Sequence, residues 1–178
     1  FYLEATKIWP EFAAAHNNLG RTLHDLGKYE DAKESFSKAI KAKPDFNAAH
    51  NNLGSTLRKM GKLDEARKSF EQAIKLSPNF AQAHSNLGNV LFDLKRFEEA
   101  ENSYRRAIKF EQGHIRAINN LGNTLRKMGK LDDAEASYRD ALALNSDIPL
   151  LHSNLARVLY AMGQHDAALE SIEKANQI

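Results

Sequence analysis

A period of 34 residues runs through the 178-residue chain and constrains its fold more than any other feature. One position is leucine in every copy, and the next is glycine until the last copy, where it is alanine. These residues are Leu19, Leu53, Leu87, Leu121 and Leu155, followed by Gly20, Gly54, Gly88, Gly122 and Ala156. Residues 51–70 and 119–138 are identical at 15 of 20 positions. A repeat of this length predicts a stack of similar supersecondary units.

Each period contains two stripes of apolar residues at helical spacing. In residues 47–80, one stripe runs through 49–60 and the second through 63–74, as two amphipathic helices require. Gly61 separates the stripes, and glycine suits the left-handed conformation that ends a helix. Pro78 stops the second helix because it cannot donate the next backbone hydrogen bond. The sequence therefore predicts an all-α chain of antiparallel helix pairs.

Small and aromatic residues also recur at fixed places in the second stripe. They form two alanine series and one mainly aromatic series: Ala32, Ala66, Ala100, Ala134 and Ala168; Ala39, Ala73, Ala107, Ala141 and Ala175; Phe36, Phe70, Tyr104, Tyr138 and Ile172. Together with Pro10, Pro44 and Pro78, these series resemble the tetratricopeptide repeat (TPR) family over essentially the whole chain. The resemblance implies a right-handed TPR superhelix, an α-solenoid whose first helices line a concave face.

Several positions depart from the TPR pattern. Histidine stands where a large residue, usually tryptophan, is typical, at His16, His50, His84 and His152, with Ile118 in the fourth copy. Gln112 and Ser146 stand where proline is expected. Helices pack about 8–10 Å apart, whereas the ligands of one zinc ion lie about 2.1 Å from it. We therefore expect packing roles for the histidines and no metal site.

The period sets the expected repeat boundaries. The repeats fall at 13–46, 47–80, 81–114, 115–148 and 149–178, and 1–12 are expected to be the second helix of a truncated preceding repeat. The last repeat lacks the polar capping helix that solenoids normally carry. The sequence therefore predicts a segment of a longer protein with two open ends.

One asparagine series stands out because asparagine is a mediocre residue inside helices. It occupies the same first-helix position in every copy: Asn18, Asn52, Asn86, Asn120 and Asn154, preceded by Asn17, Asn51, Ser85, Asn119 and Ser153. An amide offers two donors and one acceptor, so a row of amides can pair with the peptide groups of an extended guest chain. The hypothesis is a ladder that binds peptide backbone. The alternative is that each asparagine braces the adjacent repeat or descends from a duplicated unit.

Arginine and further asparagine residues extend the expected binding face. They are Arg21, Arg58, Arg126 and Arg157 with Asn89 and Asn123, and Arg116, His24, Phe92 and Tyr160 lie among them. Arginine is suited to bidentate pairing with carboxylates, which favours a mildly acidic guest. Asp25, Lys59, Asp93 and Lys127 alternate in sign along the repeats. We interpret these four as a row of ion pairs between repeats, which stabilises little at a surface.

Two likenesses within the TPR family suggest a larger context. The HNNLG and HSNLG strings around Asn18, Asn52, Asn86 and Asn154 are similar to the TPR half of O-GlcNAc transferases, in which such a ladder binds extended substrates. Residues 94–109 are similar to the TPR arms of endoplasmic-reticulum transmembrane O-mannosyltransferases. The alternative function is therefore a substrate-recognition arm of a glycosyltransferase. The family's clamp for chaperone carboxylate tails needs a lysine where Asn17 and Asn51 stand, so we expect no such binding.

Composition excludes several other classes of function. Twenty-five Lys and Arg against 23 Asp and Glu leave a net charge of +2, too balanced to indicate a nucleic-acid partner. There is no cysteine and no apolar run long enough to span a membrane. No catalytic grouping or phosphate loop appears, so we expect neither catalysis nor a cofactor in this segment. The predicted function is binding a protein or extended peptide, with self-association through the open ends as a structural alternative. The compartment is not fixed, although a cytoplasmic or nuclear one is favoured over the ER lumen.

Overall fold

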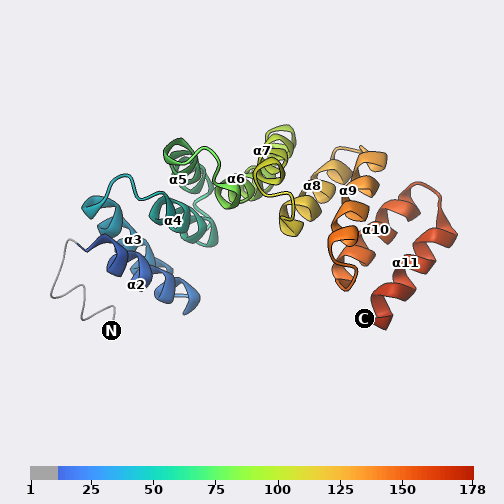
Figure 1. The fold of residues 1–178 in the computed structure, drawn as a ribbon, viewed down its shortest axis with the longest axis horizontal. Coiled ribbons are helices and arrows are strands. Elements are labelled where there is room, and N and C mark those ends of the chain that lie inside the picture. The colour runs from blue at the N-terminus through green and yellow to red at the C-terminus, as the bar shows by residue number, and fades with distance from the viewer. Residues whose placement is uncertain (1–11) are drawn as a thin grey trace. The chain divides into compact units, whose positions relative to one another are not determined.

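The computed structural model describes residues 12–178, which form α-helices joined by short loops (Figure 1). The chain divides into two compact units, unit 1 (Phe1–Leu94) and unit 2 (Lys95–Ile178). No strand occurs in the described range, so the predicted all-α class is confirmed. The expectation of a helix in 1–12 falls almost entirely on residues 1–11, which lie outside the described residues.

Within the described residues 12–94, unit 1 contains two helix pairs and one further helix. Its helices are α2 (Ala13–Asp25), α3 (Tyr29–Ala42), α4 (Asn47–Lys59), α5 (Leu63–Leu76) and α6 (Ala81–Asp93). Each helix packs against the next along the chain, and α4 also contacts α2 and α6 (Figure 1, blue to green). The first helices of successive repeats in unit 1 therefore lie side by side.

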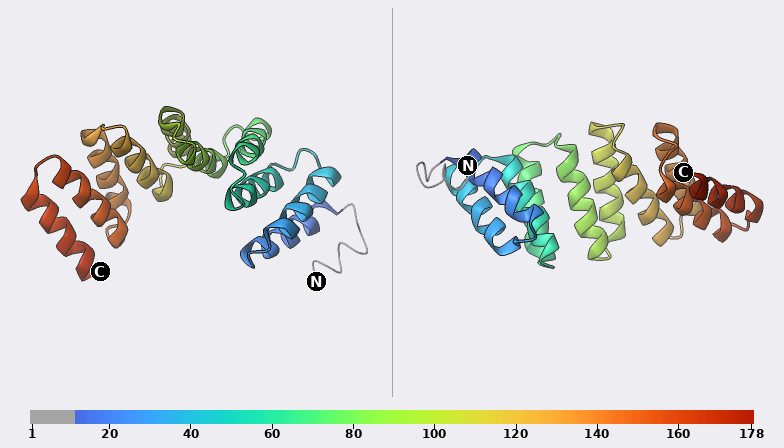
Figure 2. Two further views of the ribbon diagram at one scale, coloured as in Figure 1. Left: turned by 180° about the vertical axis from the view of Figure 1, so that it is seen from behind. Right: turned by 90° about the horizontal axis from the view of Figure 1, so that it is seen from below.

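Unit 2 begins with one helix and continues with two pairs. Its helices are α7 (Phe97–Phe110), α8 (Ile115–Lys127), α9 (Leu131–Leu144), α10 (Pro149–Ala161) and α11 (His165–Gln177). Neighbours in the chain pack together, and α10 also contacts α8. Figure 2 shows the antiparallel pair of α10 and α11 from two further sides. How the chain divides into repeats at residue level stays a prediction.

The turn between the two helices of a repeat needs a left-handed residue. Glycine supplies it at Gly27, Gly61, Gly129 and Gly163, with φ between 74° and 78°, as predicted for Gly61. In the third repeat Lys95 takes this place with φ of 61°. A side chain with a Cβ adopts that conformation at a cost of roughly 1–2 kcal/mol. Lys95 is therefore a locally strained position within the repeat pattern.

Replacing this lysine with glycine should stabilise the chain. We expect Lys95→Gly to raise the free energy of unfolding by about 1 kcal/mol, because it relieves the left-handed strain. Urea denaturation followed by circular dichroism measures the change. Lys95→Ala is the matched control, because it removes the charge but keeps the Cβ, and it should give no gain. Equal gains from both variants would contradict the explanation by backbone strain.

The glycine of the first helix makes room for the aromatic ring of the second. A Cβ at Gly54 would lie 2.8 Å from Cε1 of Phe70, and one at Gly20 or Gly122 would lie as close to Phe36 or Tyr138. The three rings are 0–1% exposed. In the last repeat, both partners change together, to Ala156 and the half-exposed Ile172. The glycine and aromatic series are thus two halves of one contact that sets how closely the helices approach.

This contact predicts a compensating pair of substitutions. Gly54→Ala should destabilise the chain by about 1–3 kcal/mol, because the added methyl group overpacks the ring. Gly54→Ala combined with Phe70→Ile copies the pair of the last repeat, so the double variant should lose less than the sum of the single variants. Chemical denaturation of all three gives the coupling energy. Gly61→Ala is the control, because nothing lies within 4 Å of its added Cβ, and it should not couple to Phe70.

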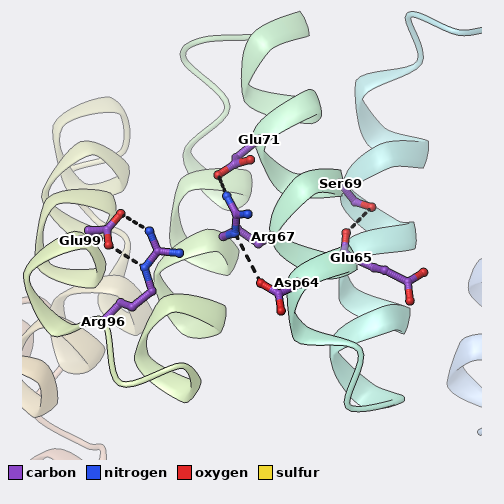
Figure 3. A network of polar contacts seen from close by, with 7 residues as sticks. All are labelled: Asp64, Glu65, Arg67, Ser69, Glu71, Arg96 and Glu99. Atoms are coloured by element: carbon purple, nitrogen blue, oxygen red, sulfur yellow. Dashed lines mark hydrogen bonds and ion pairs between the residues drawn. The ribbon is translucent and has the colours of Figure 1, made fainter.

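The second helices start with acidic residues, which the helix dipole favours. Figure 3 shows two such helix starts, with Arg67 between Asp64 and Glu71 and with Arg96 paired to Glu99. The shortest N–O distance in each group is 2.6 Å. These pairs are local and partly exposed, so each stabilises its own helix by only a few tenths of a kcal/mol.

Candidate peptide-binding face

The asparagine series makes hydrogen bonds between neighbouring first helices. Nδ2 of Asn52 donates to Oδ1 of Asn17 at 3.0 Å, and Asn86 donates to Asn51 at the same distance. In unit 2, Asn154 donates to Asn119 at 2.9 Å. Each bond joins residues 35 positions apart, which is one period plus one. These hydrogen bonds brace adjacent repeats, as the alternative to the binding-ladder hypothesis expects.

Bracing uses only part of each amide. A side-chain amide that donates one N–H retains a second N–H and an oxygen that accepts. Asn86 uses its oxygen to accept from Nε2 of Gln82 at 3.0 Å, whereas Asn52 is half-buried and lines a cavity described below. Asn154 is only 4% exposed. Asn120 of unit 2 is half-buried like Asn52, so Asn154 is the amide of the series least accessible to a guest.

The brace can be measured as a coupling energy. We expect Asn17→Ala and Asn52→Ala to be coupled by about 0.5–1.5 kcal/mol, the usual net value of one hydrogen bond. Denaturant unfolding of the two single variants and the double variant supplies the cycle. Asn18→Ala with Asn52→Ala is the matched control, because no hydrogen bond joins those side chains. A coupling near zero for Asn17 and Asn52 would show that the brace contributes nothing.

A cavity in unit 1 brings predicted residues from two helices together. Its volume is about 220 Å³, and it is lined by Arg21, His24 and Asp25 of α2, Phe36 of α3, and Asn52 and Ser55 of α4. The predicted residues Arg21 and Asn52 thus lie at one hollow. Phe36 and Ser55 belong to it as well, although the sequence indicated only packing for the first and nothing for the second. The cavity offers a cation, a carboxylate, one amide group and a ring edge to one guest side chain.

His24 closes one end of this hollow with a defined hydrogen bond. Its Nδ1 lies 3.0 Å from the hydroxyl oxygen of Thr56, which itself donates to the backbone oxygen of Asn52 at 2.9 Å. Since that hydroxyl hydrogen is already used, Nδ1 of His24 is the donor. Burial lowers the pKa of His24, and Lys59 lowers it further while Asp25 opposes this. The imidazole is therefore neutral at pH 7.

In unit 2, predicted residues gather around a tyrosine hydroxyl. The hydroxyl of Tyr138 donates to Oδ1 of Asn123 at 3.0 Å. Burial raises the pKa of this hydroxyl, while a hydrogen bond from Arg126 and the charges of Arg126 and Arg157 partly oppose the rise. The arrangement places two cations beside one polar group, which suits a carboxylate. The sequence indicated Tyr138 only as a core ring, and no feature of the pattern marks its hydroxyl.

The expected ion-pair row is built differently from the prediction. Nε of Arg58 on α4 lies 2.7 Å from Oδ2 of Asp93 on α6. The acid of the row thus pairs with Arg58, which we had assigned to guest binding, rather than with Lys59. Arg58, the partner of Asp93 in the structure, is the residue next to Lys59, which the sequence pattern suggested. Arg58 is therefore engaged within unit 1, which leaves Arg21 as the arginine at the cavity.

The other predicted residues are spread along the same helices. Asn18 and Arg21 lie on α2, and Asn89 lies half-buried on α6. In unit 2, Asn119 donates to Oδ1 of Asn120 at 3.1 Å, so these neighbours on α8 are linked. Arg116 and Arg157 are both exposed. The structure therefore brings only some of the predicted residues together, at the cavity of unit 1 and around Tyr138 in unit 2, and leaves the others spread along the helices.

The repeated histidines have a role that the sequence did not reveal. Nε2 of His50 lies 2.9 Å from the backbone oxygen of Pro44, and His84 bonds to Pro78 at the same distance. His152 bonds to the oxygen of Ser146 at 2.8 Å. A carbonyl only accepts, so Nε2 carries the proton. Each of these three histidines fastens the loop before its helix, and proline is not required there because the backbone oxygen is the acceptor.

The geometry and the repeated contacts define a TPR protein. Over residues 2–178 the chain matches the family described as cilia and flagella-associated protein 70 C-terminal domain, a TPR domain. The chain belongs to this family. No curated protein matches it.

Solved structures with the same fold are TPR proteins. PilF of Pseudomonas aeruginosa superposes with a TM-score of 0.86 at 25% identity, over 94% of this chain and 77% of that one. TTC0263 of Thermus thermophilus gives 0.75 at 27% identity, over 93% and 90%. YrrB, described as a TPR protein with an unusual peptide-binding site, gives 0.77 at 21% identity, over 98% and 90%. The predicted TPR solenoid class is thereby confirmed.

The likeness to glycosyltransferase arms gains no support from these comparisons. The family and the structures named above are TPR domains and TPR proteins, so a transferase context stays a prediction. The same holds for self-association, for the acidity of the guest and for the compartment. No helix within residues 12–178 is long and apolar enough to cross a membrane.

Proposed function

We propose that each unit of this interaction module binds an extended peptide along its own first-helix face, meaning the exposed side chains of α2, α4 and α6 in unit 1 and, separately, those of α8 and α10 in unit 2. The TPR fold is that of a protein–protein interaction module. YrrB, which shares the fold, is described as having a peptide-binding site. The observation that carries the proposal is the cavity at which Arg21 and Asn52 meet.

The amides would bind the guest backbone while the arginines select its side chains. Asn18 and Asn52 can each pair with a peptide group through a free N–H and oxygen. First helices about 8–10 Å apart and an extended chain advancing roughly 3.3 Å per residue place one amide at every third guest residue. Arg21 in unit 1, and Arg126 and Arg157 in unit 2, favour carboxylates. The guest is therefore an extended, mildly acidic segment.

The test must separate binding from bracing. A phage-displayed library of peptides about 9 residues long, enough for the three amides of unit 1 at every third residue, is selected on the chain. Fluorescence anisotropy then measures the affinity of the enriched peptides. We expect Asn18→Ala with Arg21→Ala to weaken binding roughly 5- to 30-fold, since one hydrogen bond and one charged contact are lost. Asn18 makes no hydrogen bond in a brace, so the melting temperature should stay the same.

Charge and position provide the controls. Arg105→Ala lies on α7, outside the first-helix face, and should leave this affinity unchanged. Replacing the acidic residues of a selected peptide with asparagine or glutamine should lower its affinity for the chain. If the selected peptides bind the Asn18 and Arg21 double variant as tightly as the original chain, the proposed face is wrong. Enrichment of no peptide at all would count against the function itself.

A further inference from the structure

A second hollow lies on the other side of the first helices, within unit 2. Helices α7, α8 and α9 line a cavity of about 660 Å³, within the range of ligand-binding pockets. Its floor is apolar, formed by Ile118, Leu121 and Leu125 of α8. At about 100° per residue, these three side chains leave α8 on a different side from Asn120 and Asn123. The α7–α9 groove is thus separate from the first-helix face.

The residues that open this groove are departures from the repeat. Ile118 replaces the histidine of the other repeats, and Gln112 replaces the proline; both line the cavity. On α9, Ala136 and Ala143 line it as well. The positions equivalent to Ala136 hold Glu34, Lys68, Asn102 and Glu170, and those equivalent to Ala143 hold Lys41, Lys75, Lys109 and Gln177. Apart from Gln112, apolar residues therefore replace polar ones at this groove, and the two alanines are also smaller than most of the residues they replace.

The two walls of the groove carry opposite charge. Arg105 and Lys109 line it on α7, and Asp133 and Asp140 line it on α9. Arg105 also pairs with Glu101 at 2.8 Å, whereas Lys109 and the two aspartates make no ion pair within the described residues. Asp133 stands in the first turn of α9, where the helix dipole already favours it. Asp140 lies beyond that first turn, so the dipole does not account for it.

We propose that the α7–α9 groove docks an amphipathic helix of a partner protein. The lining of α9 extends from Asp133 to Leu144, about 16 Å at 1.5 Å per residue, which accommodates three helical turns. Apolar residues at i, i+3 or i+4, and i+7 would enter the groove, where the half-exposed Leu144 extends the apolar surface. Carboxylates on one flank of the guest helix meet Arg105 and Lys109. Cations on its other flank meet Asp133 and Asp140, so the charges fix its orientation.

The experiment blocks the groove with residues that the repeat already tolerates. Ala136→Lys with Ala143→Lys copies Lys68 and Lys75 of the second repeat, so the variant should fold, which circular dichroism checks. Helix-forming peptides of about 16 residues, roughly four helical turns, are selected on the original chain after depletion on this variant. We expect an apolar i, i+3 or i+4, i+7 pattern with acids on one flank and bases on the other. The enriched peptides should bind this double variant at least about 10-fold more weakly than the original chain.

Further variants test the charge pattern and the location of the binding. Asp140→Lys, which copies Lys174 of the last repeat, should weaken peptides with the basic flank, and reversing that flank should restore them. The double variant of Asn18 and Arg21 should leave this binding unchanged, which distinguishes it from the first-helix face. Lys68→Ala with Lys75→Ala in unit 1 is the matched surface control and should have no effect. The proposal would be overturned if the enriched peptides bound the Ala136→Lys and Ala143→Lys double variant as tightly as the original chain, or if no peptide were enriched. It would also be overturned if the peptides bound in an extended form or if their binding depended on Asn18.

Discussion

The close contact between a glycine and an aromatic ring is the constraint on which the rest of the structure depends. Gly54 and Phe70 illustrate it, because the ring occupies the space that a Cβ would need. The contact sets the separation of the two helices within a pair and thereby the direction in which the first helix presents its polar side. Where the ring becomes Ile172, the glycine becomes Ala156, so the two positions change in compensating directions. The helix pair is specified locally, as expected for a repeat protein whose stability is a sum of neighbour terms.

Polar groups on the first helices serve two purposes because an amide has more than one hydrogen-bonding group. Asn52 fixes the register of α4 against α2 by donating to Asn17, and it also lines the cavity with Arg21. A brace of this kind also holds a binding group in place before a guest arrives, which reduces the entropy lost on binding. In unit 2 the corresponding arrangement is centred on Tyr138, with Asn123 as its acceptor. The same pattern thus gives the two units different local chemistry.

The sequence predicted the helices and the polar face but not the pairing of its side chains. The period and the spacing of Leu, Gly and aromatic residues suffice for the helix pairs, because these contacts lie within one repeat. Pairs between repeats depend on the register of adjacent helices, which the pattern does not state. Asp93 therefore pairs with Arg58 and not with Lys59. The doubled asparagines at 17–18 and 51–52 were a signal for the brace, since an offset of one period plus one joins them. Lys95 shows the reverse case, in which a residue with a Cβ takes the left-handed conformation that the repeat pattern assigns to glycine.

In this proposal, the side-chain amide of Asn52 both braces the fold and binds the guest. The side-chain amide of Asn52 gives two proton resonances in a ¹H–¹⁵N correlation spectrum, one for each N–H. Titration with a peptide selected on the first-helix face measures both protons at once. We expect the proton directed at Asn17 to keep its chemical shift while the resonance of the other proton shifts as the peptide concentration rises. If neither proton moves while the peptide binds, Asn52 is a brace alone and the asparagine series is not a binding ladder.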